Sequence, residues 1–337
     1  MELTKGPGMV LKELATEYDI EPAIFDSGLN VTKVEAKKGH LYSLRLAFKI
    51  RKYDAYLVFN GGVQQAAASL IAKVLFKSRI RVYFWDTNLQ NPGKNIKSTI
   101  KKTIKKLLFL SVDYFLVMHK YTLPYEKIYG ISKSKIKYIP FKANVYDSLS
   151  RYNPLDHGYI LSCGASHRDY GCLIEALKNT VLPLTIVMPD PSLASYHNTF
   201  LFDNSDLPSN IRIEYSDFDP FRWNKKIAES KFVVIPINKD SIQPAGISVY
   251  LSAMALGKAV VITEGASTIG LIDNERAVLV PPNDPIELRH AIEKLYFDDD
   301  LRERLAVSGR DYALSLQGNE RLNREIFEFI IKTLSDK

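Results

Sequence analysis

The amino-acid sequence predicts an α/β fold with two domains, each a parallel sheet covered by helices on both faces. Short apolar, β-branched runs alternate with amphipathic segments along both halves of the chain. A length of 337 residues and a hydrophobic content of 46% suffice to fill two cores. The net charge divides into +13 over residues 1–150 and −6 over residues 151–337, so the halves are expected to have different partners.

The first half is expected to alternate as follows: helix 9–18, short strand 22–26, helix 41–51, strand 55–59, a helix to about 76, strand 80–85, a lysine-rich helix over 94–108, strand 114–118, helix 122–129 and strand 136–140. A Rossmann-like domain normally begins with a strand that leads into its glycine loop. Here Gly6 and Gly8 follow only Leu3 as an apolar lead-in, so either the first strand is missing or the start is misassigned. Without that strand the Gly-x-Gly is no dinucleotide fingerprint, which argues against a dehydrogenase.

The second half repeats the alternation, with strands over 159–163, 184–188, 211–215 and 232–237 and helices over 170–178 and 223–229. The polar segment 143–157 has no apolar periodicity and is the expected domain boundary. We therefore expect an N-terminal domain over 1–148, a C-terminal domain over 149–320 and a final helix within 321–337.

The stretch 243–263 predicts a loop, a short helix and a buried strand in succession. Gly246 belongs to the loop, Ser248 can cap the helix, and the run from Ala259 to Ile262 is typical of a buried parallel strand. A helix N-terminus at the carboxyl end of such a sheet presents free N–H groups and the positive end of its dipole. We therefore expect a phosphate-binding corner at Gly246, Ile247 and Ser248. The alternative is an ordinary loop, helix and strand that bind nothing.

This stretch resembles the donor-binding signature of retaining glycosyltransferases of family 4, which have the two-domain GT-B fold. The matching residues are Gly246, Ala253-Met254-Ala255, Gly257 and Val260-Val261. The match continues through Val278-Leu279-Val280-Pro281-Pro282 and Asn283-Asp284-Pro285. It is specific from about residue 158 to 313 and weak over the first 140 residues. It implies two Rossmann-like α/β domains facing a cleft, with a C-terminal helix that crosses back to the N-terminal domain.

The resemblance implies a transferase that moves a sugar from a nucleotide sugar to a glycan or lipid-linked acceptor with retention of configuration. It places Arg168 where the family holds the donor diphosphate, and an arginine suits a phosphate well. The alternative is a surface arginine paired with Asp169. His167 could also touch phosphate, and Glu264 could lie near the donor, unless it merely forms a turn. The nucleotide sugar would be a co-substrate; no cofactor is expected, and no metal-binding constellation is visible.

Two departures from the signature concern its paired glutamates. The position near the donor sugar falls on Gln243, and the position that holds the ribose diol falls on Ser252. Glutamine can bond a sugar hydroxyl but is uncharged, and serine cannot hold a diol as a carboxylate does. The second hypothesis is therefore a catalytically silent GT-B subunit that binds a partner glycosyltransferase or a glycan. A sugar-nucleotide epimerase is a third, for which no convincing set of acidic and histidine groups is found.

Asp86 is the candidate catalytic residue, because it ends a strand whose carboxyl end would face the cleft. It would bind a sugar hydroxyl or act as a base toward the acceptor. The alternative is that it caps the next turn. His119 follows another strand end and is a weaker candidate.

The densest basic patch belongs to the lysine-rich helix and comprises Lys97, Lys101, Lys102, Lys105 and Lys106. Ile96, Ile100 and Ile104 recur every four residues, which predicts an apolar stripe. In one interpretation the stripe packs on the domain's own sheet and the lysines face water. In the other the helix also touches an anionic membrane surface or an anionic acceptor. No recognisable nucleic-acid reader is present, so no nucleic-acid partner is expected.

Cys163 and Cys172 lack metal-ligand spacing and are expected to be free thiols in a reducing compartment. The start of the chain has no apolar signal core, and no window reaches about 18 uninterrupted apolar residues. We expect a cytoplasmic protein, with peripheral attachment to the inner face of the cell membrane through the basic patch.

Overall fold

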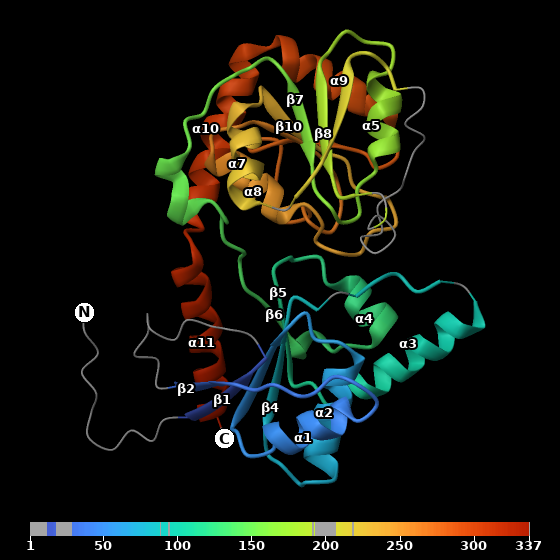
Figure 1. Cartoon of the computed structure of the whole chain (residues 1–337), viewed down its shortest axis with the longest axis vertical. Coiled ribbons are helices and arrows are strands. Elements are labelled where there is room, and N and C mark those ends of the chain that lie inside the picture. Colours follow the sequence, from blue (N-terminus) through green and yellow to red (C-terminus); the bar gives the residue numbers. More distant parts are fainter. Residues whose placement is uncertain are drawn as a thin grey trace. The chain divides into compact units, whose positions relative to one another are not determined.

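The computed structural model describes residues 12–17, 29–87, 89–93, 95–190, 192, 207–217 and 219–336, which form two compact units (Figure 1). The N-terminal unit comprises residues up to 140, except 119–121, and the C-terminal helix; the C-terminal unit comprises 119–121 and 141–319. Gly6, Gly8, Lys94 and the strand expected over 22–26 lie outside the described residues.

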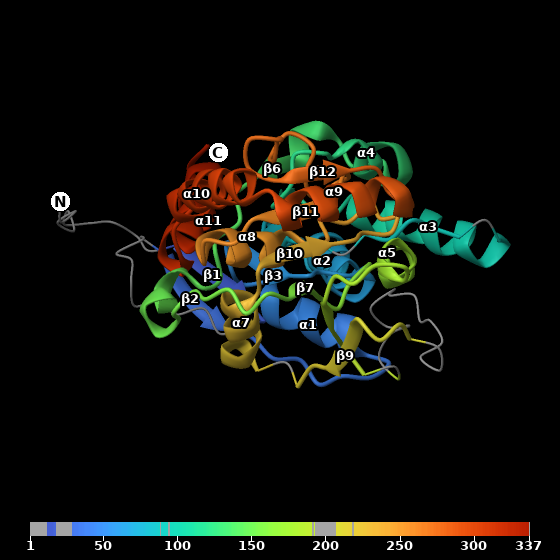
Figure 2. The same cartoon turned by 90° about the horizontal axis from the view of Figure 1, so that it is seen from above.

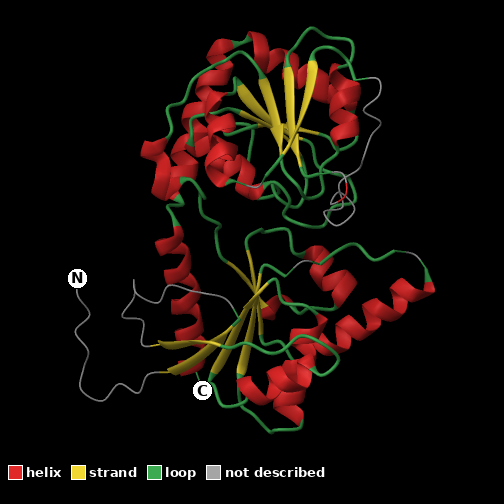
Figure 3. Cartoon of the chain, in the orientation of Figure 1, coloured by secondary structure: helices red, strands yellow, loops and turns green. Residues whose placement is uncertain are grey.

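The N-terminal unit is built on a parallel six-stranded sheet in the order β2-β1-β3-β4-β5-β6 (Figure 3). Its strands are β1 (Lys12–Thr16), β2 (Leu29–Lys33), β3 (Ala55–Phe59), β4 (Arg81–Trp85), β5 (Tyr114–Val117) and β6 (Ile136–Tyr138). Its helices are α1 (Tyr42–Ile50), α2 (Val63–Val74), α3 (Ile96–Phe109), α4 (Leu123–Tyr129) and α11 (Asn319–Ser335). The elements expected after residue 40 are confirmed, with ends that differ by a few residues.

The helix expected over 9–18 is wrong in its described part, because residues 12–16 form β1. This strand lies between β2 and β3, and its Leu14 and Ala15 are fully buried. Pairing on both sides and burial outweigh the local helix preference of so short a segment. β1 follows Gly6 and Gly8 in the chain, so it is not the strand expected to lead into that glycine loop, and β2 is an element that the sequence did not predict.

Helix α3 differs from the expectation in the direction of its apolar stripe. Ile96, Ile100 and Ile104 are exposed, and Phe109 is the only buried residue of the helix. The interpretation in which the stripe packs on the domain's own sheet is therefore wrong.

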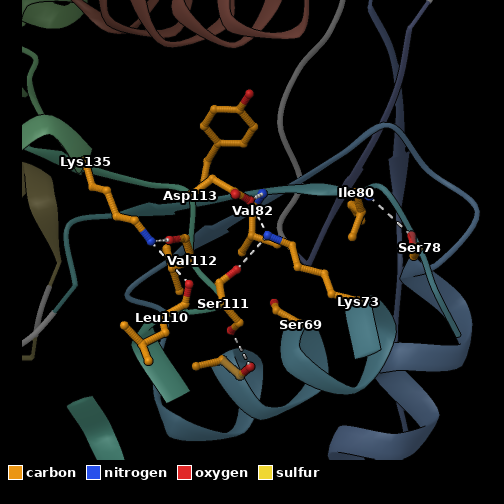
Figure 4. A network of polar contacts seen from close by, with 12 residues as sticks. Ser69, Lys73, Ser78, Ile80, Val82, Leu110, Ser111, Val112, Asp113 and Lys135 are labelled. Carbon is orange, nitrogen blue, oxygen red and sulfur yellow. Dashed lines mark hydrogen bonds and ion pairs between the residues drawn. The ribbon is translucent and has the colours of Figure 1, made fainter. Parts of the chain in front are cut away.

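A polar network fixes the amino ends of β4 and β5 (Figure 4). The Asp113 carboxylate accepts hydrogen bonds from Lys73 Nζ (2.5 Å) and from the N–H of Val82 (2.7 Å). Lys73 Nζ also donates to the carbonyl of Ser111 (2.8 Å), and Lys135 Nζ donates to that of Val112 (2.7 Å). These side-chain bonds join β4 and β5 at their amino ends, in addition to the backbone pairing of the two strands.

The C-terminal unit has a second parallel sheet in the order β12-β11-β10-β7-β8-β9. Its strands are β7 (Ile160–Cys163), β8 (Leu184–Met188), β9 (Ile211–Tyr215), β10 (Phe232–Ile235), β11 (Val260–Thr263) and β12 (Val278–Val280). Its helices are α5 (Tyr170–Leu177), α7 (Pro220–Glu229), α8 (Ile247–Ala255), α9 (Pro285–Phe297) and α10 (Asp299–Ser315). The chain starts at β7, runs outward to β9 and returns to β10, so the strand order reverses between β7 and β10. The expected α/β class with two Rossmann-like sheets is confirmed.

The last helix, α11, packs on the N-terminal sheet as expected for a helix that crosses back. The Thr333 hydroxyl shares a hydrogen bond with the Tyr83 hydroxyl of β4 (2.7 Å), and the Arg81 guanidinium donates to the Thr333 carbonyl. Near its start, Arg321 donates to the carbonyl of Pro140 (2.8 Å). Phe329 stacks edge-on against Tyr114 at 5.1 Å, so aromatic as well as polar contacts attach the helix.

Candidate functional site

The loops that follow β7 and β10 are joined at the point where the second sheet reverses its order. The N–H of Asn238 donates to the carbonyl of His167 (2.9 Å), and the N–H of Asp169 donates to that of Pro236 (3.1 Å). Between these bonds Arg168 and Ile237 form an isolated antiparallel bridge. In open α/β sheets, ligands bind outside the carboxyl ends of the strands at such a switch point. This corner is therefore the candidate site of the C-terminal unit.

Arg168 is a buried cation in this corner, with only 2% of its surface exposed. Its Nε donates to the carbonyl of Cys163 (3.2 Å) and its Nη1 to that of Ser166 (2.8 Å). In the described part of the chain no carboxylate pairs with it. Asp169 instead caps α5 by accepting from the N–H of Cys172 (3.1 Å), so the alternative of a surface Arg168–Asp169 pair is wrong.

The Arg168 guanidinium lies against Gly164, in space that a side chain at position 164 would fill. A Cβ at Gly164 would lie 2.1 Å from Nη2, and the glycine has φ +136°, which side-chain-bearing residues rarely adopt. Burial lowers the pKa of Arg168, because the charged form loses hydration there. A buried charge without an ionic partner is unfavourable, which makes this corner attractive to an anion.

The N-terminus of α8 is the second feature of the corner. Gly246, at φ +93°, is the N-cap residue and offers no side chain to the helix end. No hydrogen bond is made by the N–H groups of Gly246, Ile247 or Ser248 within the described ranges. Ser248 lies in the first turn and is exposed, so the expectation that it caps the helix is wrong. Three free N–H groups and the helix dipole make this end a suitable anion site.

Packing explains why a glycine stands at position 246. A Cβ there would approach Ile235 Cγ2 to 3.0 Å and Ile262 Cδ1 to 3.6 Å, and both isoleucines belong to central strands. The chain therefore passes close over the carboxyl ends of β10 and β11 before α8 begins. Every residue of α8 except Ser248 is buried, so the helix end has a fixed position relative to the sheet.

The other residues predicted to bind the nucleotide sugar differ in how far their side chains are exposed. Gln243 and Ser252 are buried, with 8% and 4% of their surfaces exposed, and Ser252 lies within α8. Glu264 directly follows β11, donates its N–H to the carbonyl of Val280 (2.8 Å), and has an exposed side chain. All three belong to the C-terminal unit, together with Arg168. Their roles toward a donor stay predictions.

Asp86 belongs to the N-terminal unit and follows β4. Its N–H donates to the carbonyl of Leu116 (2.9 Å), and its φ of +50° is uncommon for a residue other than glycine. Its carboxyl group accepts no hydrogen bond from any described residue, so no cap of the next turn is seen among them. Burial raises the pKa of this carboxyl to about 6.

Tyr125 of α4 lies near the carboxyl end of β4, whereas His119, which follows β5 in the chain, is grouped with the C-terminal unit. Tyr125 donates to the carbonyl of Thr87 (3.3 Å), and its pKa is raised first by burial and then by the negative charge of Asp86. His119 is fully buried, and burial lowers its pKa to about 4, so its imidazole is neutral at pH 7. Within the described ranges, no three His, Cys, Asp or Glu side chains are close enough to hold a metal ion.

The sequence did not indicate two parts of the C-terminal site. The segment 236–238, which bonds to the Arg168 loop, follows an apolar strand that carries no polar signature. Gly164 directly follows β7, but its contact with Arg168 becomes visible only once the loop is folded. The single available signal was that both segments follow buried strands, since ligands gather at the carboxyl ends of some such strands.

No protein-family model matches the sequence, and no curated protein matches it. Solved structures resemble the fold. A glycosyltransferase from Rickettsia africae superposes with a TM-score of 0.67 at 16% identity, over 95% of this chain and 90% of the other. Anabaena HepE in complex with UDP and glucose gives 0.67 at 13% identity, over 95% and 99%. Sucrose-phosphate synthase from Thermosynechococcus elongatus gives 0.64 at 15% identity, over 93% and 85%. The protein therefore has the GT-B fold of these glycosyltransferases.

Proposed function

We propose that this protein is a glycosyltransferase that moves a sugar from a nucleoside-diphosphate sugar to a glycan or lipid-linked acceptor and keeps the anomeric configuration. The observation that carries the proposal is the buried Arg168 guanidinium, which has no carboxylate partner in the described structure and lies at the switch point of the second sheet. A diphosphate would supply the missing negative charge.

The shape of the corner supports a phosphate ligand rather than a carboxylate side chain from elsewhere in the protein. Three unused N–H groups at the start of α8 and the guanidinium of Arg168 are both found at the carboxyl end of the same sheet. Together they offer several donors to one doubly charged group, whereas a single carboxylate has only two acceptor oxygens. In a transfer reaction the same donors would stabilise the charge that develops on the leaving diphosphate.

The solved complexes support a uridine nucleotide as the donor. HepE has been crystallised with UDP and with UDP-glucose, and Staphylococcus aureus TarM with UDP and a GlcNAc-glycerol compound. UDP is therefore the nucleotide to test first. Retention of configuration follows from the resemblance to the family 4 signature and is part of the same proposal.

Asp86 is the proposed catalytic residue of the N-terminal unit. A carboxyl group with a pKa near 6 is ionised at pH 7 to 8, yet remains basic enough to take a proton from an acceptor hydroxyl. Its carboxyl group has no competing hydrogen bond among the described residues. Substrate hydroxyls can therefore bind to it without displacing a protein donor.

The neutral Gln243 and Ser252 imply a donor held without carboxylates at these two positions. We propose that the sugar hydroxyls bond to amide and hydroxyl groups and that most of the donor affinity comes from the diphosphate. Loss of the phosphate contacts should then be unusually harmful, because no ribose contact of comparable strength replaces them.

Calorimetric titration with UDP tests the proposal. Arg168→Gln should weaken binding by about 1.5–3 kcal/mol, or roughly 10- to 150-fold in Kd, the range for a hydrogen bond to a charged group. Arg289→Gln is the matched control, because Arg289 lies on α9 of the same unit and pairs, among the described residues, with Glu293 of its own helix. Equal UDP affinity in all three proteins would remove Arg168 from the donor site. If the parent binds no UDP, GDP, ADP or CMP, the silent subunit becomes the better hypothesis.

A further inference from the structure

Helix α3 turns an apolar stripe away from its own domain. The stripe consists of Ile96, Ile100, Ile104 and Leu107 and continues into Leu110, and these side chains are between 47% (Ile104) and 80% (Ile96) exposed. Figures 1 and 2 show that α3 projects from the rest of the N-terminal unit. Apolar side chains gathered in this way on a surface mark an interaction site rather than scattered surface residues.

The opposite side of α3 faces the protein. Phe109 is buried there, and Lys105 lies half-buried with its Nζ 6.0 Å from the Phe109 ring and 5.4 Å from the Tyr129 ring. At 100° per residue, Lys105 projects about 160° away from Leu107. The orientation is thus the reverse of that of an ordinary surface helix, in which the apolar side packs inward.

Lysines border the exposed stripe. Lys97 and Lys101 are exposed along one side of it, and Lys106 is half-exposed along the other. No acidic residue occurs between Asp86 and Asp113, and residues 36–112 contain 16 Lys or Arg against two Asp or Glu. The surface of α3 therefore combines apolar insertion with strong positive charge.

We propose that α3 binds the surface of an anionic lipid bilayer, with the apolar stripe inserted at the level of the headgroups and the bordering lysines in contact with lipid phosphates. An interfacial helix has this arrangement of an apolar side flanked by basic residues. A second copy of the chain fits less well, because pairing two such helices would bring their lysines together. No helix in the described part of the chain is long and apolar enough to cross a membrane.

Vesicle co-sedimentation tests this surface directly. The full chain should bind vesicles of phosphatidylcholine and phosphatidylglycerol at 70:30 and bind pure phosphatidylcholine at least about tenfold more weakly. Ile100→Ser/Ile104→Ser should reduce binding to the anionic vesicles at least about tenfold, because it removes the inserted side chains and keeps the charge. Lys97→Gln/Lys101→Gln should also weaken binding and should reduce its dependence on salt.

Matched controls come from the C-terminal unit. Ile286 and Val307 are 65% and 56% exposed, comparable with Ile100 and Ile104, so Ile286→Ser/Val307→Ser should leave vesicle binding unchanged. Lys178→Gln/Lys225→Gln is the control for charge, since both lysines pair with glutamates on their own helices or beside them. A melting temperature equal to that of the parent shows that each variant is folded.

Three outcomes would overturn the proposal. The first is an absence of binding to anionic vesicles, and the second is equal binding by Ile100→Ser/Ile104→Ser and the parent. The third is a dimer in light scattering that Ile100→Ser/Ile104→Ser converts to a monomer without a change in vesicle binding. None of these results depends on nucleotide binding, so failure of this proposal is distinguishable from failure of the donor site.

Discussion

Replacing Gly164 by alanine probes how the Arg168 guanidinium is held. The new Cβ would stand 2.1 Å from Nη2 and 2.4 Å from Cζ, so the guanidinium must move away. Moving it breaks the bonds from Nε to Cys163 and from Nη1 to Ser166. The backbone of Gly164 must also remain at φ +136° with a side chain attached.

The two effects together set the expected magnitude. Backbone strain at such a φ amounts to about 1–3 kcal/mol, and rearranging the hydrogen bonds of the guanidinium adds on the order of 1–2 kcal/mol. We expect a loss of roughly 2–5 kcal/mol in the free energy of unfolding. For a unit of this size that corresponds to a melting temperature lower by about 4–20 °C.

Two other glycines serve as controls that separate the effect of backbone strain from the effect of displacing the Arg168 guanidinium. Gly158 has φ +79° but no atom within 4 Å of an added Cβ, so Gly158→Ala reports backbone strain alone. Gly265 has neither a left-handed φ nor a neighbour within 4 Å, so Gly265→Ala should be nearly neutral. The order of melting temperatures should therefore be Gly265→Ala, then Gly158→Ala, then Gly164→Ala as the lowest.

Nucleotide binding gives the second measurement on the same three variants. Gly164→Ala should lose UDP affinity along with Arg168→Gln, whereas Gly158→Ala and Gly265→Ala should keep it. A Gly164→Ala variant that is as stable as Gly158→Ala and binds UDP like the parent would refute this account of how the guanidinium is held. Arg168 would then have an alternative position that the anion site tolerates.

Three further predictions concern Asp86, Ser252 and Thr333. Because the folded-state pKa of Asp86 is raised from 3.8 to about 6, its ionisation destabilises the fold as pH rises through this interval. Asp86→Asn should therefore raise the free energy of unfolding at pH 7.5 by up to about 3 kcal/mol and should leave it unchanged at pH 3.5. The same variant should abolish sugar transfer. An equal increase in the free energy of unfolding at both pH values would contradict this pKa. Ser252→Glu should lower the melting temperature of the nucleotide-free protein, because position 252 is buried and a carboxylate is unfavourable there. It should also tighten UDP binding. Weaker UDP binding in calorimetry would contradict a ribose contact at position 252. Thr333→Val should cost about 1–2 kcal/mol in urea unfolding because it breaks the bond to the Tyr83 hydroxyl, and Tyr83→Phe should add little in the double variant; additive losses would mean that the two hydroxyls act separately.

The C-terminal unit could be predicted well because its signals are local. The strands expected over 184–188 and 211–215 have those ends in the structure, and α8 begins at Ile247, two residues before the start expected from a cap at Ser248. Glycine and proline mark its loops, and uninterrupted β-branched runs mark its central strands, so neighbouring residues carry most of the information. The capping residue of α8 was misassigned, since Gly246 adopts a left-handed conformation that lets the helix begin at Ile247, and α7 and β10 differ from their expected ends by two or three residues.

The N-terminal unit was harder to predict where pairing decides the structure. The segment 12–16 has charged residues and alanine, which favour a helix locally, yet it becomes a strand between β2 and β3. The partners are 17 and about 40 residues away in sequence, so no local window contains them. The sequence likewise predicted that α3 is amphipathic but not which way its apolar side would face.

By itself, the sequence determined the alternation of helices and strands, the parallel sheets and the segment that forms the α8 corner, because hydrophobic period and turn residues act over a few neighbouring positions. Only the tertiary structure decided that Arg168 is buried against Gly164 without a carboxylate partner, that segment 236–238 joins its loop, and that the α3 stripe faces outward. These properties depend on which strands lie side by side and on which side of a helix meets the sheet. Contacts between distant segments set both, and local composition does not encode them.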